Sequence, residues 1–281
     1  MPPCSEMGVI MLILNIAGYK FIALNELAQL KSLLLEVCSK QQVKGTILLS
    51  QEGINISLAG QPQDIQAFQS FLQADDRFSD MTFHETYSNA LPFRTLKVKL
   101  KGEIITLRQP EVNPHTQRAP CISPIELKQW LDEERDITLL DTRNDYEVHF
   151  GTFKGAVNLH IDHFGEFPQV VNEVERDKPI VMFCTGGIRC EKAAFYMLQK
   201  GFQEVYQLEG GILGYFSAVG GTHYEGECFV FDGRIALGPD MQKTGTLQCQ
   251  VCQGPIDAAD QPFTQSSKVI CIQCYNNFPS T

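Results

Sequence analysis

The chain has 281 residues, of which 43% are hydrophobic, and its formal net charge at pH 7 is −10. This length is enough for about two ordinary domains or three small ones, so we expect a soluble globular protein. The apolar residues 7–16 are too few to cross a bilayer and lack the basic leader of a signal peptide. We therefore expect a cytoplasmic protein without a membrane segment.

The first part of the chain alternates strand and helix patterns. Apolar runs predict strands at residues 8–17, 43–49, 54–58, 81–87 and 95–107. Two amphipathic helices separate them, the first with Asn25 as its N-cap and the second beginning at Pro62. The order strand, helix, strand, strand, helix, strand predicts a ferredoxin-like or acylphosphatase-like domain over residues 1–108.

Basic residues are concentrated in one segment, although the acidity of the whole chain does not favour nucleic-acid binding. Residues 91–118 hold six Lys and Arg against two Glu, a local balance of +4. Lys97, Lys99 and Lys101 alternate, so on a strand they share one face, with Arg94 close to its start. We expect this row to bind RNA phosphates. The alternative is that the lysines protect an edge strand from aggregation.

The middle of the chain follows a polar segment with two prolines, residues 109–118, which we interpret as a linker. Ser123 is followed by proline and then, at the third position, by glutamate, the pattern of a capping box at a helix start. A strand at residues 137–140 ends in Asp141 and Arg143. We expect this pair to lock a loop together rather than to catalyse a reaction.

The strongest indication of chemistry comes next. Four apolar residues, 180–183, predict a buried parallel strand with Cys184 at its carboxyl end, where open α/β sheets bind their ligands. Gly186 and Gly187 can adopt positive φ and turn backbone N–H groups toward an anion. Arg189 and a helix start add positive potential, so the pattern predicts a Cys184 thiolate. The alternative is a small buried cysteine that only packs.

The loop resembles the active-site loop of a rhodanese domain, and it comprises Cys184, Thr185, Gly186, Gly187, Ile188 and Arg189. In that family the cysteine carries a persulfide, and the resemblance implies a rhodanese domain over residues 119–219. Cysteine-based phosphatases place the arginine six positions after the cysteine, where this chain has Cys190. A sulfur-sized or oxygen-sized cargo therefore fits better than a phosphate.

Cys190 is the second cysteine of this stretch. It begins the predicted helix, whose dipole favours its thiolate as well. It is a candidate resolving cysteine for an oxidised or sulfurated intermediate on Cys184. The alternative is a small residue that packs the first helical turn.

Four of the ten cysteines form two pairs near the C-terminus. The pattern C-x2-C-x18-C-x2-C, made by Cys249, Cys252, Cys271 and Cys274, is typical of a zinc ribbon. We expect one structural zinc in a Cys-rich segment over residues 220–281. An empty reduced site and redox-active pairs are the alternatives. The chain has neither a P-loop nor G-x-G-x-x-G, so we expect no nucleotide cofactor.

A second metal motif is weaker. His160 and Asp162 have the His-x-Asp spacing with which many non-haem iron sites begin. No third ligand can be assigned, and histidine and aspartate are common in polar loops. We prefer the interpretation without iron.

Beyond the loop, the chain resembles the rhodanese-domain-containing tRNA uridine 5-hydroxylase family. The segments that carry this resemblance are residues 45–55, 94–99, 183–192 and 228–232, and together they cover nearly the whole chain. The resemblance implies an oxidoreductase that uses dioxygen to form 5-hydroxyuridine at the wobble position, 34, of tRNA. It also implies that Cys184 is the active residue and that the first domain holds the RNA.

Two other functions are compatible with the residues. The loop alone fits a sulfurtransferase that passes sulfur from a Cys184 persulfide to an acceptor. The Cys-rich segment and basic strand also fit an RNA-binding module without chemistry, which an intact active-site loop disfavours. No flavin or haem motif indicates how oxygen is activated.

Overall fold

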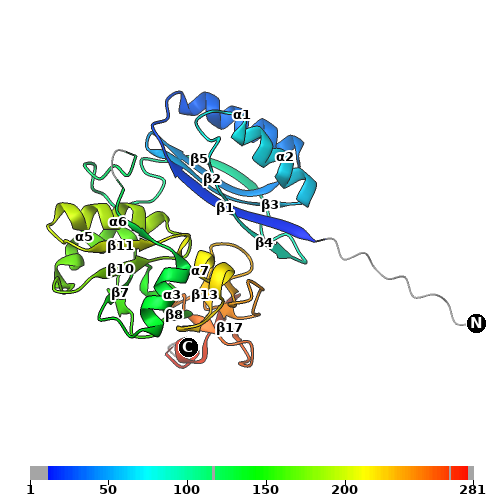
Figure 1. Ribbon diagram of the computed structural model, residues 1–281. Helices are drawn as coiled ribbons and strands as arrows, with labels where there is room; N and C mark the ends of the chain where they lie inside the picture. Colours follow the sequence, from blue (N-terminus) through cyan, green and yellow to red (C-terminus); the bar gives the residue numbers. More distant parts are fainter. Residues whose placement is uncertain (1–11, 116–117, 266, 278–281) are drawn as a thin grey trace, which may run out of the picture.

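A computed structural model describes residues 12–115, 118–265 and 267–277. It has the expected α/β class, with an N-terminal sheet unit, a central parallel sheet and a C-terminal segment of short strands (Figure 1). Residues 8–11, at the start of the first expected strand, lie outside the described residues. In the described part of the chain, no helix is both long enough and apolar enough to cross a membrane.

The N-terminal unit is the predicted ferredoxin-like sheet, with both helices on one face (Figure 1). Its elements are β1 (Ile13–Phe21), α1 (Leu27–Lys40), β2 (Lys44–Ser50), β3 (Gly53–Gly60), α2 (Pro62–Gln73), β4 (His84–Ser88) and β5 (Leu96–Leu100). The strand order is β4-β1-β3-β2-β5, and β5 pairs in parallel with β2 at one edge. β2 and β3 pair antiparallel and form a hairpin.

Alternating side chains give this sheet two different faces. Ile47 and Ile56 are buried with Phe68 under α1 and α2. Side chains of the opposite parity, such as Thr46 and Asn55, lie on the face that looks toward the central unit. This second face supplies one wall of the cavity described below.

The start of the first helix differs from the prediction. Asn25 is not its N-cap, because the chain enters α1 through Glu26 in the left-handed region (φ 51°). The carbonyl oxygen of Glu26 accepts the backbone N–H of Leu30 at 3.1 Å. The cap position is therefore one residue later than the side-chain preference of asparagine indicates.

The last strand is also shorter than predicted, since β5 ends at Leu100 rather than at residue 107. The chain turns away after it because Glu103 provides an alternative partner for the backbone. Its carboxylate accepts the N–H groups of Leu107 and Arg108 at 2.9 and 3.1 Å. Leu107 then packs in the core of the central unit.

The central unit is a five-stranded parallel sheet with strand order β6-β11-β10-β7-β9. Its strands are β6 (Cys121–Ile122), β7 (Thr138–Asp141), β9 (Val157–Asn158), β10 (Ile180–Phe183) and β11 (Val205–Leu208). Its helices are α3 (Pro124–Asp132), α4 (Asp145–Val148), α5 (Phe167–Val170), α6 (Ile188–Gln199) and α7 (Gly211–Val219), with 3-10 turns at Phe164–Glu166 and Val171–Glu173. The Ser123 hydroxyl accepts the N–H of Glu126 at 3.2 Å, which confirms the cap of α3.

The C-terminal segment consists of short antiparallel pairs. They are β12 (Tyr224–Gly226) with β8 (Gly151–Phe153), β13 (Cys228–Phe229) with β14 (Ala236–Leu237), β15 (Leu247–Gln248) with β16 (Pro255–Ile256), and β17 (Phe263–Gln265) with β18 (Lys268–Ile270). The helix α8 (Ile272–Asn276) follows. The core of the last two pairs and α8 is small and contains two cysteines beside Ile256 and Ile270.

Candidate active site

Cys184 follows the last residue of β10 and is fully buried (0% exposed) at the start of the loop that leads into α6. The backbone N–H of Gly187 donates to its Sγ at 3.1 Å. Of the two glycines expected to adopt positive φ, only Gly187 does so (φ +97°). A side chain at this position would meet the Tyr19 hydroxyl at 2.9 Å. The loop therefore needs glycine for its conformation and for its contact with β1.

The surroundings of Cys184 favour its thiolate, as the sequence predicts. Burial works to raise the pKa of Cys184, but a hydrogen bond from Cys190, the Arg189 charge and backbone N–H groups lower it to about 5. The prediction that Cys190 is also a thiolate is wrong. Burial and the neighbouring Cys184 raise the pKa of Cys190 well above its ordinary value. Cys190 therefore remains a thiol that donates to Cys184.

Arg189 has a partner that the sequence reasoning missed. Its guanidinium makes two bonds to the Glu147 carboxylate, Nη1 to Oε1 at 2.6 Å and Nη2 to Oε2 at 2.8 Å. Glu147 is fully buried and belongs to a capping box with Asn144 at the start of α4. The spacing Asn144-x-x-Glu147 was the available signal, although it indicates a helix start rather than an active-site contact.

A cavity of about 660 Å³ opens at this loop, a volume within the range of small-molecule sites. Three parts of the chain line it. The N-terminal sheet contributes Tyr19, Thr46, Asn55, Ser57 and His84; the loop contributes Cys184, Thr185, Gly186, Ile188 and Arg189; and the C-terminal segment contributes Phe231, Asp232 and Arg234. Cys184 thus lines a chamber between the units rather than a cleft within one domain.

The basic row lies beside this chamber. In the parallel pairing of β5 with β2, Lys97 is in register with Thr46 and Lys99 with Leu48, and both β2 residues line the cavity. The two lysines are exposed, whereas Val98 between them is buried, so they extend the cavity face to the sheet edge. Lys101 lies just beyond the end of β5 and Arg94 before its start.

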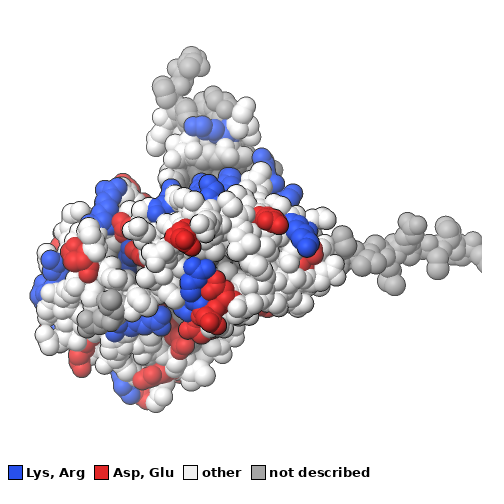
Figure 2. All heavy atoms as spheres, turned by 90° about the horizontal axis from the view of Figure 1, so that it is seen from above, with Lys and Arg blue, Asp and Glu red and all other residues white. Residues whose placement is uncertain are grey.

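Charge on other parts of the surface is mixed. Figure 2 shows Lys and Arg interspersed with Asp and Glu on the upper face of the molecule, without one continuous basic band. A general affinity for polyanions therefore has little support on that face. The position of Lys97 and Lys99 next to the cavity is a more specific indication of an RNA-binding surface than the overall charge.

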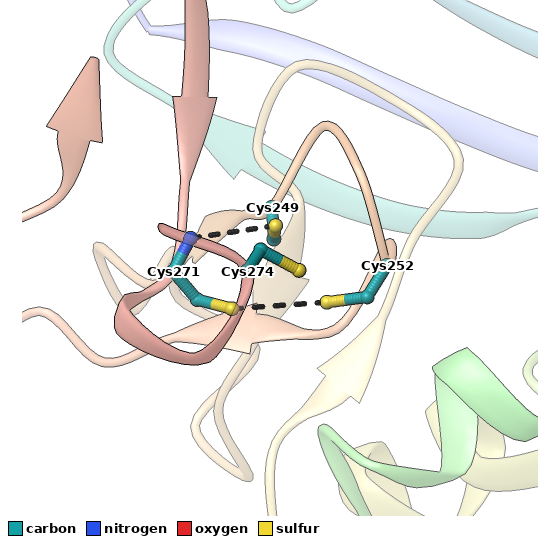
Figure 3. Close-up of side chains that lie close together, drawn as sticks. All are labelled: Cys249, Cys252, Cys271 and Cys274. Atoms are coloured by element: carbon teal, nitrogen blue, oxygen red, sulfur yellow. Dashed lines mark hydrogen bonds between the residues drawn. The ribbon is translucent and has the colours of Figure 1, made fainter. Parts of the chain in front are cut away.

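The four C-terminal cysteines converge. Cys249 and Cys252 lie in the turn after β15, Cys271 follows β18 and Cys274 lies in α8, and their side chains point toward one another (Figure 3). Their sulfur atoms all lie within 4.8 Å of one another, with 3.9 Å between those of Cys252 and Cys271. Four sulfurs around one zinc ion stand about 3.8 Å apart when each Zn–S bond is about 2.3 Å. The arrangement fits a tetrahedral ion.

The residues of two further sequence motifs form local ion pairs. Asp141 and Arg143 form a fully buried ion pair, with Nη2 to Oδ2 at 2.6 Å, as expected. His160 is exposed, and its Nδ1 lies 2.7 Å from Oδ1 of Asp145 rather than near Asp162. Among the described residues, the only group of three or more His, Cys, Asp or Glu that could hold a metal is the cysteine cluster. The iron interpretation therefore gains no support.

Comparison with known proteins agrees with this architecture. Residues 13–104 match the UPF0176 acylphosphatase-like domain, and residues 123–218 match the rhodanese-like domain. Residue 13 is the first of β1, and Ser123 is the N-cap of α3. The two matches therefore begin where the two folded units begin.

Several relatives resemble the chain over most of its length. Proteins named tRNA uridine(34) hydroxylase are 46% identical in Cupriavidus pinatubonensis and 48% identical in Ralstonia nicotianae, each over 89% of this chain and 92% of the relative. The protein of that name in Burkholderia pseudomallei is 44% identical over 93% of this chain and 92% of its own. Because the similarity extends over all three units, the chain belongs to the tRNA uridine(34) hydroxylase family.

Proposed function

We propose that this protein is an oxidoreductase that hydroxylates C5 of the uridine at position 34 of tRNA, with dioxygen as the oxygen source. One oxygen atom is inserted into the C5–H bond to give the hydroxyl group, and the other leaves as water with two electrons and two protons from a reductant. The activity in the names of the relatives supports this reaction. A protein that acts on tRNA is expected in the cytoplasm.

The observation that carries the proposal is the cavity at Cys184. A simple persulfide carrier does not need a second domain at its cysteine, whereas here Cys184 lines a chamber of about 660 Å³ that the N-terminal sheet helps to build. The chamber is large enough for one nucleotide. A base must leave its stack before an enzyme can reach its C5 atom, and a chamber of this kind receives such a base.

Within this proposal Cys184 is the reaction centre. The loop of Thr185, Gly186, Gly187, Ile188 and Arg189 holds the anionic forms of its sulfur, and Gly187 already donates to the Sγ atom at 3.1 Å. Cys190 donates to Cys184 as a thiol, which suits it to resolve an oxidised Cys184 as a disulfide.

We further propose that Lys97, Lys99, Lys101 and Arg94 bind tRNA phosphates. Their place on and around the edge strand next to the cavity supports a path in which one nucleotide enters the chamber and its neighbours follow β5. The proposed division of the chain is 1–108 for the RNA-binding domain, 109–118 for a linker, 119–219 for the rhodanese domain and 220–281 for the Cys-rich segment. Val112 of the linker is buried in the central core, so this connection is packed.

A structural zinc held by Cys249, Cys252, Cys271 and Cys274 completes the proposal. The fit of the four sulfurs to a tetrahedral ion supports it. The ion would cross-link a segment whose apolar core is small.

Mass spectrometry of tRNA nucleosides tests the reaction. A strain that lacks this gene should lose the species 16 Da heavier than uridine at position 34, and wild-type protein should restore it. Cys184→Ser should restore nothing although the variant folds, whereas Cys121→Ser, which changes an exposed cysteine outside the loop, should restore it fully. Full activity of Cys184→Ser would show that the loop is not the reaction centre.

The second candidate is sulfur transfer through a Cys184 persulfide. The rhodanese-like match and the five-residue spacing to Arg189 favour it. Purified protein incubated with thiosulfate would then gain one sulfur on Cys184 and release sulfite, and it would release thiocyanate when cyanide is added. Steady thiocyanate turnover with an unchanged tRNA would favour this function over hydroxylation.

A further inference from the structure

Phe231 is an exposed aromatic ring at the mouth of the reaction chamber. Its side chain is 61% exposed, whereas the neighbouring Phe229 is 5% exposed. It lines the same cavity as Cys184 and Arg189. Burial of a phenylalanine ring is strongly favourable, so a ring left open at an active site calls for a ligand that covers it.

The ring is held in place from behind. Phe229 contacts Phe231 edge to face, with 5.2 Å between ring centroids and 89° between the planes. Phe229 in turn packs against Tyr146 and Phe150 of the central unit. The exposed ring therefore packs against Phe229, which two further aromatic side chains hold in place.

The backbone around Phe231 is tied to the N-terminal unit. The N–H of Gly233 donates to the carbonyl oxygen of Pro92 at 3.1 Å, and a side chain at Gly233 would meet that oxygen at 2.7 Å. Arg234 pairs with Asp232 and also donates from Nη1 to the Thr86 hydroxyl. Contacts on both sides fix the position of the segment, so the ring needs little reorganisation to bind a ligand.

The positive charge of Arg189 near the ring limits which ligands could cover Phe231. The Arg189 guanidinium carbon lies 5.8 Å from the Phe231 ring centroid. The guanidinium lies over the ring, so a flat, π-bonded group that stacks on the exposed part of Phe231 would lie beside this cation, in the cavity that the Cys184 loop also lines. A nucleobase has this shape, and base–aromatic stacking is a general means of holding an unstacked base.

We propose that Phe231 is the stacking platform for the base of the nucleotide that enters the chamber. This inference rests on the proposed function and deepens it, because it names the group that positions uridine 34 over the cysteine loop. Removing the ring should weaken binding of an anticodon stem-loop roughly 5- to 150-fold, the range for removal of one base–aromatic stack.

Three variants test the platform through binding and hydroxylation. Phe231→Ala should weaken binding and raise KM, and Phe231→Tyr should restore both. Tyr87→Ala is the matched control, because Tyr87 is also an exposed aromatic residue (45%). It lies opposite Leu14 in the N-terminal sheet, on the face that the helices cover and away from the cavity. This variant should change neither quantity. Equal binding by Phe231→Ala and wild type, with both folded by circular dichroism, would overturn the proposal.

A fluorescence experiment reports the stack without requiring turnover. The chain has one tryptophan, so Phe231→Trp adds a single reporter and wild type gives the background. A stem-loop with uridine at position 34 should quench the new fluorescence, and the same stem-loop with an abasic position 34 should not. Equal quenching by both, or none when the stem-loop is bound, overturns the platform. Specific quenching without any hydroxylated product would refute the proposed reaction and leave the platform standing.

Discussion

At the scale of single residues, the site depends on two interactions of the Arg189 guanidinium, one with the Cys184 thiolate and one with the Glu147 carboxylate. Cys184 and Arg189 could be predicted because strand, glycines and arginine follow one another in the sequence. Glu147 could not be predicted as a site residue, since it comes from α4, 42 positions before its Arg189 partner. The sequence pattern also assigns Arg189 entirely to the cysteine, whereas a buried carboxylate offsets part of its charge.

The first prediction concerns the titration of Cys184. Its pKa is lowered to about 5, so the thiolate should form as pH rises through 5, whereas an ordinary thiol with a pKa of 9.0 needs far higher pH. The rate at which a small alkylating reagent labels the peptide that contains Cys184 should therefore be half-maximal near pH 5 and level above about pH 7. Peptide mass spectrometry resolves this label from that on other cysteines. A midpoint near pH 9 would contradict the proposed thiolate.

The second prediction concerns Glu147. Glu147→Gln keeps the shape of the side chain but leaves the Arg189 guanidinium without its counter-charge in a buried place. Loss of one partner of a buried ion pair costs about 3–5 kcal/mol. Urea unfolding should show a decrease of this order. Glu133→Gln, which breaks a surface pair with Arg135, should leave the unfolding midpoint unchanged.

At the scale of elements, strands and helices followed the sequence patterns, whereas their ends did not. The βαββαβ order and the two apolar helix faces are local patterns, so the sequence predicts them. The ends of β5 and α1 depend on a carboxylate, Glu103, and on one left-handed residue, Glu26, and neither has a periodic signature. Hydrophobic pattern therefore identifies an element better than it identifies where the element stops.

The third prediction concerns β5. Lys97→Glu combined with Lys99→Glu should weaken tRNA binding and lower the slope of log K against log salt, by about 0.7 to 0.9 for each phosphate that the variant no longer binds. The matched control is Lys31→Glu with Lys40→Glu on α1, which makes the same charge change on the covered side of the sheet. If both double variants bind equally, a general charge effect explains the weaker binding and β5 is not the RNA surface.

The fourth prediction concerns the cysteine cluster. Purified protein should contain about one zinc, and Cys252→Ser should lose it. Because metal binding contributes directly to folding, amide hydrogen exchange should then accelerate over residues 247–276 and stay slow in the central sheet. Cys121→Ser should keep its zinc. Protein that is prepared without chelator and contains no zinc would remove this claim.

At the scale of the whole molecule, the units are joined by a buried lysine and two partly buried carboxylates, a contact that no local pattern reveals. Lys192 of α6 is 1% exposed, and its Nζ lies 2.7 Å from Glu52 and 2.6 Å from Glu103, both of the N-terminal unit. The cavity was also beyond sequence reasoning, because residues from three distant segments build it. The family resemblance indicated that the units act together, and the structure provides the contacts.

The fifth prediction concerns this junction. Lys192→Met leaves Glu52 and Glu103 without their shared cation, so the two units should separate more easily and calorimetry should resolve two unfolding transitions in place of one. Lys178→Met, at an exposed pair with Asp136, should keep the wild-type profile. A single unchanged transition in Lys192→Met would show that the junction rests on other contacts.

The same junction should weaken in acid. Burial works to raise the pKa of Glu103, but Lys192 and two backbone N–H groups hold it below its usual value. A carboxylate whose pKa is lowered by folding contributes its stability above the ordinary pKa of about 4.5. That contribution disappears as pH falls through the folded value.

The position of Phe231 in the chain has a consequence for the timing of synthesis. The cysteine loop and the N-terminal sheet are translated before residues 228–237, which complete the chamber. Domains fold as they emerge during translation, so Cys184 becomes reactive before its last wall exists. A ribosome paused in this interval would hold a nascent chain whose Cys184 thiolate lacks one wall of its chamber.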